Sequence, residues 1–172
     1  ELLPVAKKSP HIALITILFP DHLNTYASMR DYAEAKANIF KFQTPDDFLV
    51  LNYQNGWTKF FLSKKPKARV FYFSPKSFPT RVNGVCVKNK RVIFQKDGAE
   101  YLLGRIGKFE QVRGSHNLEN LLASVLGARL YSKRFVLSQH MIKTLPSVNF
   151  RQEIILRSRK LSVVNDSAET TE

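Results

Sequence analysis

The most constraining feature of this sequence is an unbroken apolar run, Ile12 to Leu18, which is rich in β-branched residues and ends at Phe19-Pro20. A strand that is buried on both faces of a parallel sheet has this continuous pattern, whereas a strand with one solvated face alternates. Residues 28–40 follow with the spacing of an amphipathic helix, and Phe48 to Asn52 is a second apolar run. Because parallel neighbours need a crossover connection, this order predicts a βαβ unit.

The apolar period changes to two between residues 82 and 104. Turn sequences at Asn89-Lys90 and Asp97-Gly98 separate three short runs there, which predicts an antiparallel meander. A third strand is predicted over Ala68 to Phe73, with helices over residues 118–126 and 132–145. The predicted fold class is therefore α/β: a largely parallel sheet flanked by helices, with a small antiparallel meander.

A domain boundary is predicted between residues 145 and 146. The pattern restarts after Pro146 with two short candidate strands, residues 153–156 and 161–164. Residues 1–145 then form one domain, and residues 146–172 form a linker and the start of another.

The charge and cysteine content restrict the kind of protein. The net charge is +13, which favours anionic partners and leaves a basic nucleic-acid-binding module as one alternative. The basic residues come in twos and threes, however, and no run reaches five. Cys86 is the single cysteine, so an internal disulfide and a Cys-based zinc site are excluded, and a reducing cytosol fits. The longest apolar stretch is far shorter than a membrane span, so we expect no membrane partner.

A phosphate-binding loop of the Walker type is absent from this sequence. The nearest candidate, residues 104–109, has two residues between its glycines where four are needed, and Phe109 stands where a Mg²⁺-binding hydroxyl is needed. His22 follows the first apolar run, at the edge where open α/β sheets bind ligands. It could hold a metal, act as a base, or be an ordinary loop residue.

Three further residues have both a functional and a structural interpretation. Asn117 and Asn120 open a predicted helix one turn apart, so their amides could together bind a planar base or ribose. Alternatively, Asn117 could simply cap that helix. Lys36 lies mid-helix beside the apolar stripe, where a lysine is usually solvated.

Five segments together resemble the Mur ligase family. Residues 16–24 resemble the motif TNI-x-PDHLD, and residues 32–40 resemble the helix that follows it. Residues 114–120 are similar to GxHNxxN, residues 151–153 to HRxE, and residues 165–170 to NDSKAT, the element of the D-glutamate-adding members. The order and spacing of the five segments carry the resemblance.

The resemblance implies an internal fragment of a longer ligase. Glu1-Leu2 is similar to the end of the family's SSFEL element, so the Walker A loop would lie upstream. Residues 1–145 would be the later part of the central ATPase domain. Residues 146–172 would contain the linker and the first strands of a Rossmann-like C-terminal ligase domain.

The resemblance also implies a Mg²⁺ site. Glu1 and His22 fall on ligand positions, and Lys36 falls on a lysine that CO₂ carbamylates. Carbamylation gives the side chain carboxylate-like oxygens, which are the ligands that Mg²⁺ prefers. His22 and Lys36 are also the expected catalytic positions, and we expect all three side chains to face one cleft.

A nucleotide site is implied at four further positions, and a substrate-binding position at a fifth. Asn117 and Asn120 match contacts to the base and sugar of ATP, and Arg151 matches a phosphate contact. Asp166 matches a ribose contact, and Thr170 matches a position near D-glutamate.

The implied activity is ATP-dependent addition of D-glutamate to UDP-N-acetylmuramoyl-L-alanine, through an acyl phosphate, in peptidoglycan precursor synthesis. The resemblance implies a cytoplasmic protein, which we expect to be monomeric, with no nucleic-acid partner. Four residues depart from the family pattern: Ile17, Asn24, Phe150 and Ala168. They leave open a sister enzyme, either another Mur ligase or a folylpolyglutamate-type ligase.

Overall fold

The computed structural model describes residues 7–18, 26–109, 114–145, 153–158 and 161–165. The chain divides into two compact units, Glu1–Ser138 and Gln139–Glu172. None of the helices among the described residues is long and apolar enough to cross a membrane.

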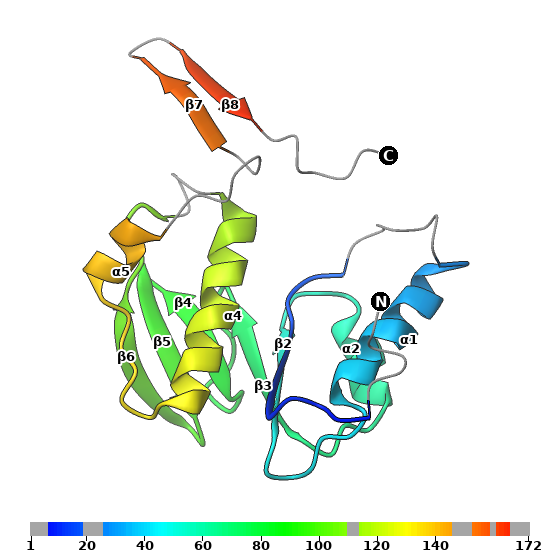
Figure 1. The fold of residues 1–172 in the computed structure, drawn as a ribbon. Coiled ribbons are helices and arrows are strands. Elements are labelled where there is room, and N and C mark those ends of the chain that lie inside the picture. The colour runs from blue at the N-terminus through cyan, green and yellow to red at the C-terminus, as the bar shows by residue number, and fades with distance from the viewer. Residues whose placement is uncertain (1–6, 19–25, 110–113, 146–152, 159–160, 166–172) are drawn as a thin grey trace. The chain divides into compact units, whose positions relative to one another are not determined.

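The first unit is built on a six-stranded sheet whose strands follow one another in sequence order (Figure 1). The strands β1 to β4 are mutually parallel, and β5 and β6 are antiparallel to their neighbours. This arrangement confirms the predicted fold class and the predicted βαβ unit. The strands are β1 (Ile12–Ile15), β2 (Phe48–Asn52), β3 (Arg69–Ser74), β4 (Gly84–Lys88), β5 (Arg91–Lys96) and β6 (Ala99–Arg105).

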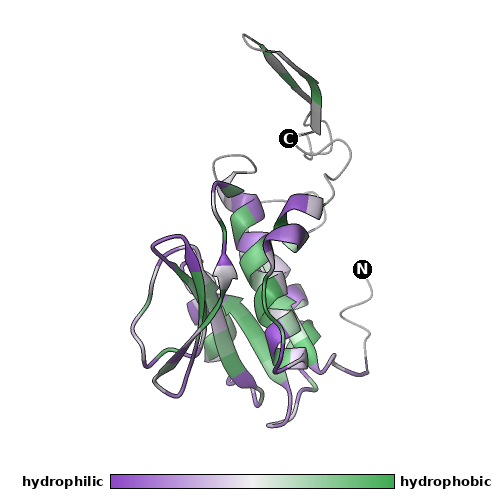
Figure 2. Ribbon diagram, turned by 90° about the vertical axis from the view of Figure 1, so that its left-hand side faces the viewer, coloured by the Kyte–Doolittle hydropathy of each residue, from purple (hydrophilic) through white to green (hydrophobic). Residues whose placement is uncertain are grey.

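Helices cover both faces of this sheet (Figure 1). The helix α1 (Met29–Ala37), its 3₁₀ continuation η2 (Asn38–Phe40) and α2 (Thr58–Ser63) lie on one face, and α4 (Ser115–Tyr131) lies on the other. Figure 2 shows hydrophobic residues concentrated along the strands and on α4. Side chains that are buried on both faces explain why the first strands have continuous apolar runs.

Alternate residues of each strand pack against different helices. On the α1 side, one core cluster joins the strands to the helices and includes Ala13, Leu49, Leu51, Tyr32, Phe40 and Phe61. On the other face, a methyl group added to Gly127 of α4 would meet the Leu14 side chain at 3.5 Å. The helix α4 buries one side through Leu118, Leu121, Leu122, Val125 and Leu126. Burial of such side chains stabilises the domain by about 1.5–3 kcal/mol each.

The antiparallel meander forms as predicted, and its turns explain its sequence. Asn89 and Lys90 have φ values of 49° and 60°, and Asp97 and Gly98 have φ values of 51° and 81°. Two consecutive residues with positive φ form a type I′ turn, whose twist matches that of antiparallel strands. Gly84 lies where β4 meets β3, and no side chain fits there, because a Cβ would be 1.8 Å from the Tyr72 carbonyl oxygen.

The structure differs from the sequence-based prediction in three elements. The first strand ends at Ile15 rather than at residue 18, and α2 was not predicted. The predicted helix over residues 132–145 is wrong in its first half. There, Leu137 forms a parallel bridge with Gly104, and its N–H donates to the Leu103 carbonyl at 2.8 Å. Pairing with the edge of β6 satisfies backbone groups that a helix would otherwise satisfy internally.

The second unit contains α5 (Gln139–Thr144) and a hairpin of β7 (Glu153–Arg157) and β8 (Ser162–Asn165). The hairpin confirms the two short strands predicted after Pro146. The boundary between residues 145 and 146, and the identity of the segment as the start of a Rossmann-like domain, remain predictions.

Candidate functional site

The candidate site lies at the edge of the sheet where the parallel strands end. Because β1 and β2 are parallel, α1 runs antiparallel to them, and its first turn lies near the carboxyl end of β1. The first turn of α4 lies at the same edge of the sheet, on its other face (Figure 1). Open α/β sheets bind ligands at this edge, because helix N-termini and loops with free polar groups meet there.

Lys36 lies in the last turn of α1. Ser28 caps the helix, because its hydroxyl accepts a hydrogen bond from the Asp31 N–H at 3.1 Å. Lys36 is half-buried, and its Nζ lies 5.0 Å from the centroid of the Tyr32 ring, one turn back along the helix. The Tyr32 ring in turn packs at 5.1 Å against Tyr26. The Lys36 ammonium is therefore directed toward the end of α1 that borders the carboxyl edge.

The other residues of the predicted Mg²⁺ site, Glu1 and His22, lie outside the described residues. The part of the chain that the structure describes contains no group of three or more His, Cys, Asp or Glu side chains that could hold a metal. The predicted cleft shared by Glu1, His22 and Lys36 therefore remains a prediction.

Asn117 and Asn120 lie in the first two turns of α4, three residues apart and thus on one side of the helix. The helix is capped by Gly114, with a φ of 82° and no side-chain cap hydrogen bond. The N-cap residue of α4 is therefore Gly114 and not Asn117. Asn117 is half-buried and Asn120 is exposed, so the Asn120 amide is open to a ligand. The remaining predicted contacts, Arg151, Asp166 and Thr170, lie outside the described residues.

At the carboxyl end of β2, Asn52 organises a loop that sequence reasoning did not single out. Asn52 is 3% exposed, and its Oδ1 accepts a hydrogen bond from the Gln54 N–H at 3.0 Å. The Asn52 carbonyl accepts a hydrogen bond from the Thr58 hydroxyl at 2.5 Å. A buried Asn immediately after an apolar run is the one sequence signal that could have marked this loop.

At the opposite edge of the sheet, a polar network connects the residues that precede β1 and β2. His11 Nδ1 and Asp47 Oδ1 are 2.8 Å apart, and Asp47 Oδ2 accepts a hydrogen bond from the Thr44 N–H at 2.7 Å. The Thr44 amide and then the His11 side chain hold the pKa of Asp47 below its ordinary value. Arg69 lies over the Phe48 ring at 4.2 Å in the same region. These contacts connect the starts of β1 and β2, and we assign them a structural role.

Comparison with known proteins identifies the family. Residues 3–128 match the family model described as the Mur ligase middle domain. The chain belongs to the Mur ligase family. The resemblance inferred from the five sequence segments is therefore confirmed.

Curated Mur ligases resemble nearly the whole chain. The chain is 34% identical to the UDP-N-acetylmuramoylalanine--D-glutamate ligase of Streptococcus agalactiae serotype III, over 99% of the chain and 36% of that protein. The ligase of the same name from Clostridioides difficile is 35% identical, over 94% of the chain and 35% of its own length. The chain thus spans about a third of the length of the curated relatives it matches.

Solved Mur ligases share the fold. A crystal structure of MurF from Acinetobacter baumannii matches 92% of this chain and 34% of its own, with a TM-score of 0.62 and 16% identity. MurF from Thermotoga maritima, in complex with ADP, matches 96% of this chain and 36% of its own, with a TM-score of 0.60 and 14% identity. At these identities the likeness shows the fold alone.

Proposed function

We propose that this chain is part of a cytoplasmic, monomeric, ATP-dependent Mur ligase that adds D-glutamate to UDP-N-acetylmuramoyl-L-alanine in peptidoglycan precursor synthesis. The observation that carries the proposal is the shared location of two elements at the carboxyl edge of the sheet. These are the first turns of α4, with Asn117 and Asn120, and the end of α1 toward which Lys36 is directed. The names of relatives at 34% and 35% identity support the choice of substrates.

The nucleotide is assigned to α4 because of the chemistry of its amides. An Asn side chain offers a donor and an acceptor in one plane, which suits the edge of a base or a ribose hydroxyl. Asn117 and Asn120 offer two such groups on one side of the helix. We propose that Arg151 and Asp166 complete the site at the phosphates and the ribose, and that Thr170 lies near D-glutamate.

The metal is assigned to Glu1, His22 and Lys36. An unmodified lysine repels Mg²⁺, so Lys36 fits this site only as a carbamate, whose oxygens are suitable hard ligands. Its half-buried position beside Tyr32 holds the side chain toward the carboxyl edge. Bound Mg²⁺ would offset phosphoryl charge. In the proposed reaction the substrate carboxylate takes a phosphoryl group from ATP, and the amine of D-glutamate then displaces phosphate.

Adenosine binding tests the nucleotide assignment on this chain alone, because adenosine needs no phosphate loop. In two-dimensional NMR we expect adenosine to shift the α4 amide signals, with a Kd on the order of millimolar. We expect Asn117→Ala and Asn120→Ala each to raise this Kd at least several-fold. Tyr131→Ala, a change of an exposed residue at the far end of the same helix, is the matched control. Equal binding by all four proteins would refute the assignment.

A segment exchange tests the reaction. These 172 residues replace the matching segment of the Streptococcus agalactiae ligase, and ADP formation is measured with UDP-N-acetylmuramoyl-L-alanine and each amino acid in turn. We expect ADP formation with D-glutamate and none with L-lysine or meso-diaminopimelate. A folded chimera that prefers another amino acid would instead favour a sister ligase.

A further inference from the structure

A cavity of about 410 Å³ lies between the loop that follows β2, the helix α2 and the strand β3. It is lined by Tyr53, Gln54, Asn55, Gly56, Thr58, Lys59, Leu62 and Tyr72. Small-molecule sites commonly have volumes of about 300–1,000 Å³. The nucleotide assignment uses none of these residues, so the proposal for this cavity rests on different side chains.

Two aromatic rings, those of Tyr53 and Tyr72, line this cavity. The Tyr53 and Tyr72 ring centroids are 5.6 Å apart at 85°, and Tyr53 also packs at 5.2 Å against Phe78. Tyr53 nevertheless remains 41% exposed, and Leu62 across the cavity is 36% exposed. Burial raises the pKa of Tyr72 above its ordinary value. Two rings held at a fixed angle offer a planar ligand both a face and an edge.

The loop after β2 holds the cavity open before any ligand arrives. The Asn52 hydrogen bonds to Gln54 and Thr58 fix its two sides, and Asn55 Oδ1 accepts a hydrogen bond from the Trp57 N–H at 2.9 Å. A Cβ added at Gly56 would have no atom within 4 Å, so space remains there. A preformed site loses less conformational entropy on binding than a mobile one.

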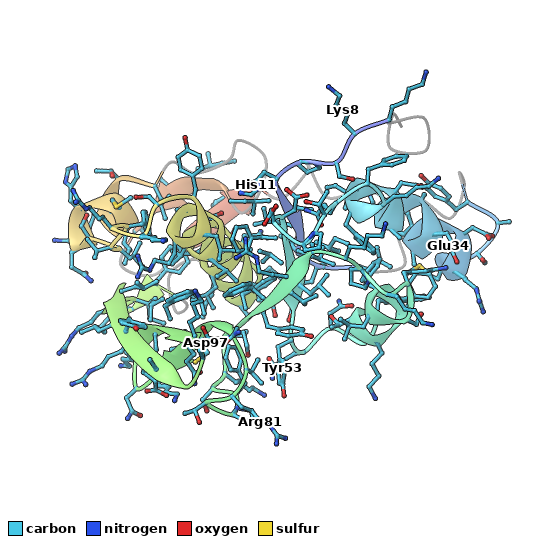
Figure 3. The ribbon with its side chains drawn as sticks, turned by 90° about the horizontal axis from the view of Figure 1, so that it is seen from below. Lys8, His11, Glu34, Tyr53, Arg81 and Asp97 are labelled. Carbon is cyan, nitrogen blue, oxygen red and sulfur yellow. The ribbon has the colours of Figure 1, made fainter. Side chains whose placement is uncertain are left out.

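The polarity of the lining selects an anion. Lys59 is the single charged residue among the lining residues, and no carboxylate lines the cavity. Within the described residues Lys59 has no ion-pair partner, whereas Lys64 at the end of the same helix pairs with Glu34. Arg81, also exposed, projects on the same face of the sheet as Tyr53 (Figure 3). Among the described residues that line the cavity, the charge is therefore positive.

We propose that this cavity binds a small planar aromatic anion, such as an aromatic carboxylate, with its ring against Tyr53 and Tyr72 and its negative group at Lys59. The proposal combines two independent requirements, a ring and a negative charge, and each can be removed separately from the ligand. Benzoate has both, benzylamine has the ring with a positive charge, and cyclohexanecarboxylate has the negative charge without an aromatic ring.

Trp57 reports binding, because it is the single tryptophan and lies between Gly56 and Thr58, which both line the cavity. Its fluorescence is followed in the 172-residue chain while each ligand is added. We expect a saturable change with benzoate, with a Kd on the order of millimolar for a ligand of this size, and at least about tenfold weaker binding of the other two. Equal affinity for benzoate and benzylamine, or no saturation with benzoate, would overturn the proposal.

Matched variants locate the site. Lys59→Met should raise the Kd for benzoate about tenfold or more, while Lys59→Arg should preserve most of the affinity. Lys67→Met removes the same charge from an exposed lysine outside the cavity lining and should leave the Kd unchanged. Tyr53→Leu should weaken benzoate binding while the urea midpoint shows that the domain remains folded. The same Kd for the Lys59→Met and Lys67→Met variants would show that benzoate binds elsewhere.

Discussion

Replacement of Gly84 by alanine should destabilise the domain far more than the same replacement at two other glycines. A Cβ at Gly84 would lie 1.8 Å from the Tyr72 carbonyl oxygen and 2.8 Å from the Tyr72 nitrogen. The φ of Gly84 is +154°, which L-residues rarely adopt. Both constraints arise where β3 meets β4, so the substitution should act on that junction.

The magnitude follows from the contacts that must change. To relieve the overlap, β4 must move away from β3 by more than about 1 Å. This movement disrupts the hydrogen bonds around the pairs Tyr72↔Gly84 and Phe73↔Val85. Loss of roughly two or three backbone hydrogen bonds, at about 1 kcal/mol each, adds to backbone strain of about 1–3 kcal/mol. We therefore expect a loss of about 3–6 kcal/mol from a typical stability of about 5–15 kcal/mol.

Two further glycines provide the comparison. A Cβ at Gly98 would meet no atom within 4 Å, but its φ is +81°, so Gly98→Ala should cost only about 1–2 kcal/mol. Gly56 has open space and no left-handed φ, so Gly56→Ala should change stability by about 1 kcal/mol or less.

Urea unfolding, followed by circular dichroism and Trp57 fluorescence, measures all three variants. With a slope of about 2 kcal/mol per molar urea, the Gly84→Ala midpoint should fall by roughly 1.5–3 M. A Gly84→Ala midpoint that falls no further than that of Gly98→Ala would refute the reasoning, since both residues have positive φ and only Gly84 has the backbone overlap.

Three other predictions concern pH, activity and charge. The pKa of Asp47 is lowered in the folded state. Ionised Asp47 therefore stabilises the fold fully at pH values above its ordinary pKa of about 3.9, and this stabilisation is lost as the pH falls through the lowered pKa of the folded state. Asp47→Asn should therefore weaken the dependence of the urea midpoint on pH in that acidic range. The 172-residue chain alone should form no ADP from ATP with both substrates, because the sequence lacks the backbone amides of a phosphate loop; measurable turnover would contradict this. The Kd of the chain for duplex DNA should be no tighter than about 10⁻⁴–10⁻⁶ M at physiological salt. A titration at two salt concentrations measures this Kd, and tight, sequence-dependent binding would favour the nucleic-acid-binding alternative.

The elements that local sequence encodes were predicted correctly. The apolar runs of β1 and β2 and the helix between them define a βαβ unit, and parallel pairing confirms it. The turns at Asn89-Lys90 and Asp97-Gly98 were identified because their residues tolerate the positive φ that a type I′ turn requires. In these cases the deciding interaction lies within a few residues, so the sequence pattern contains it.

The candidate site was only partly accessible from the sequence. The spacing of Asn117 and Asn120 places both on one side of a helix, and the structure confirms that helix. The cap at Gly114 and the direction of the Lys36 ammonium toward Tyr32 depend on backbone conformation and packing, which spacing does not encode. Glu1 and His22 are connected to Lys36 by the family resemblance alone.

Contacts between distant residues were decided by the tertiary structure. Residues 132–138 have a composition compatible with a helix, but Leu137 pairs with Gly104 because the edge of β6 offers unpaired backbone groups. His11 and Asp47 are separated by 36 residues, and Tyr53 and Tyr72 meet only because β2 and β3 are neighbours in the sheet. The sequence alone therefore determined the type and order of the main elements, through local periodicity and turn chemistry. The tertiary structure decided the cavity beside α2 and the joined starts of β1 and β2, because both depend on which strands become neighbours.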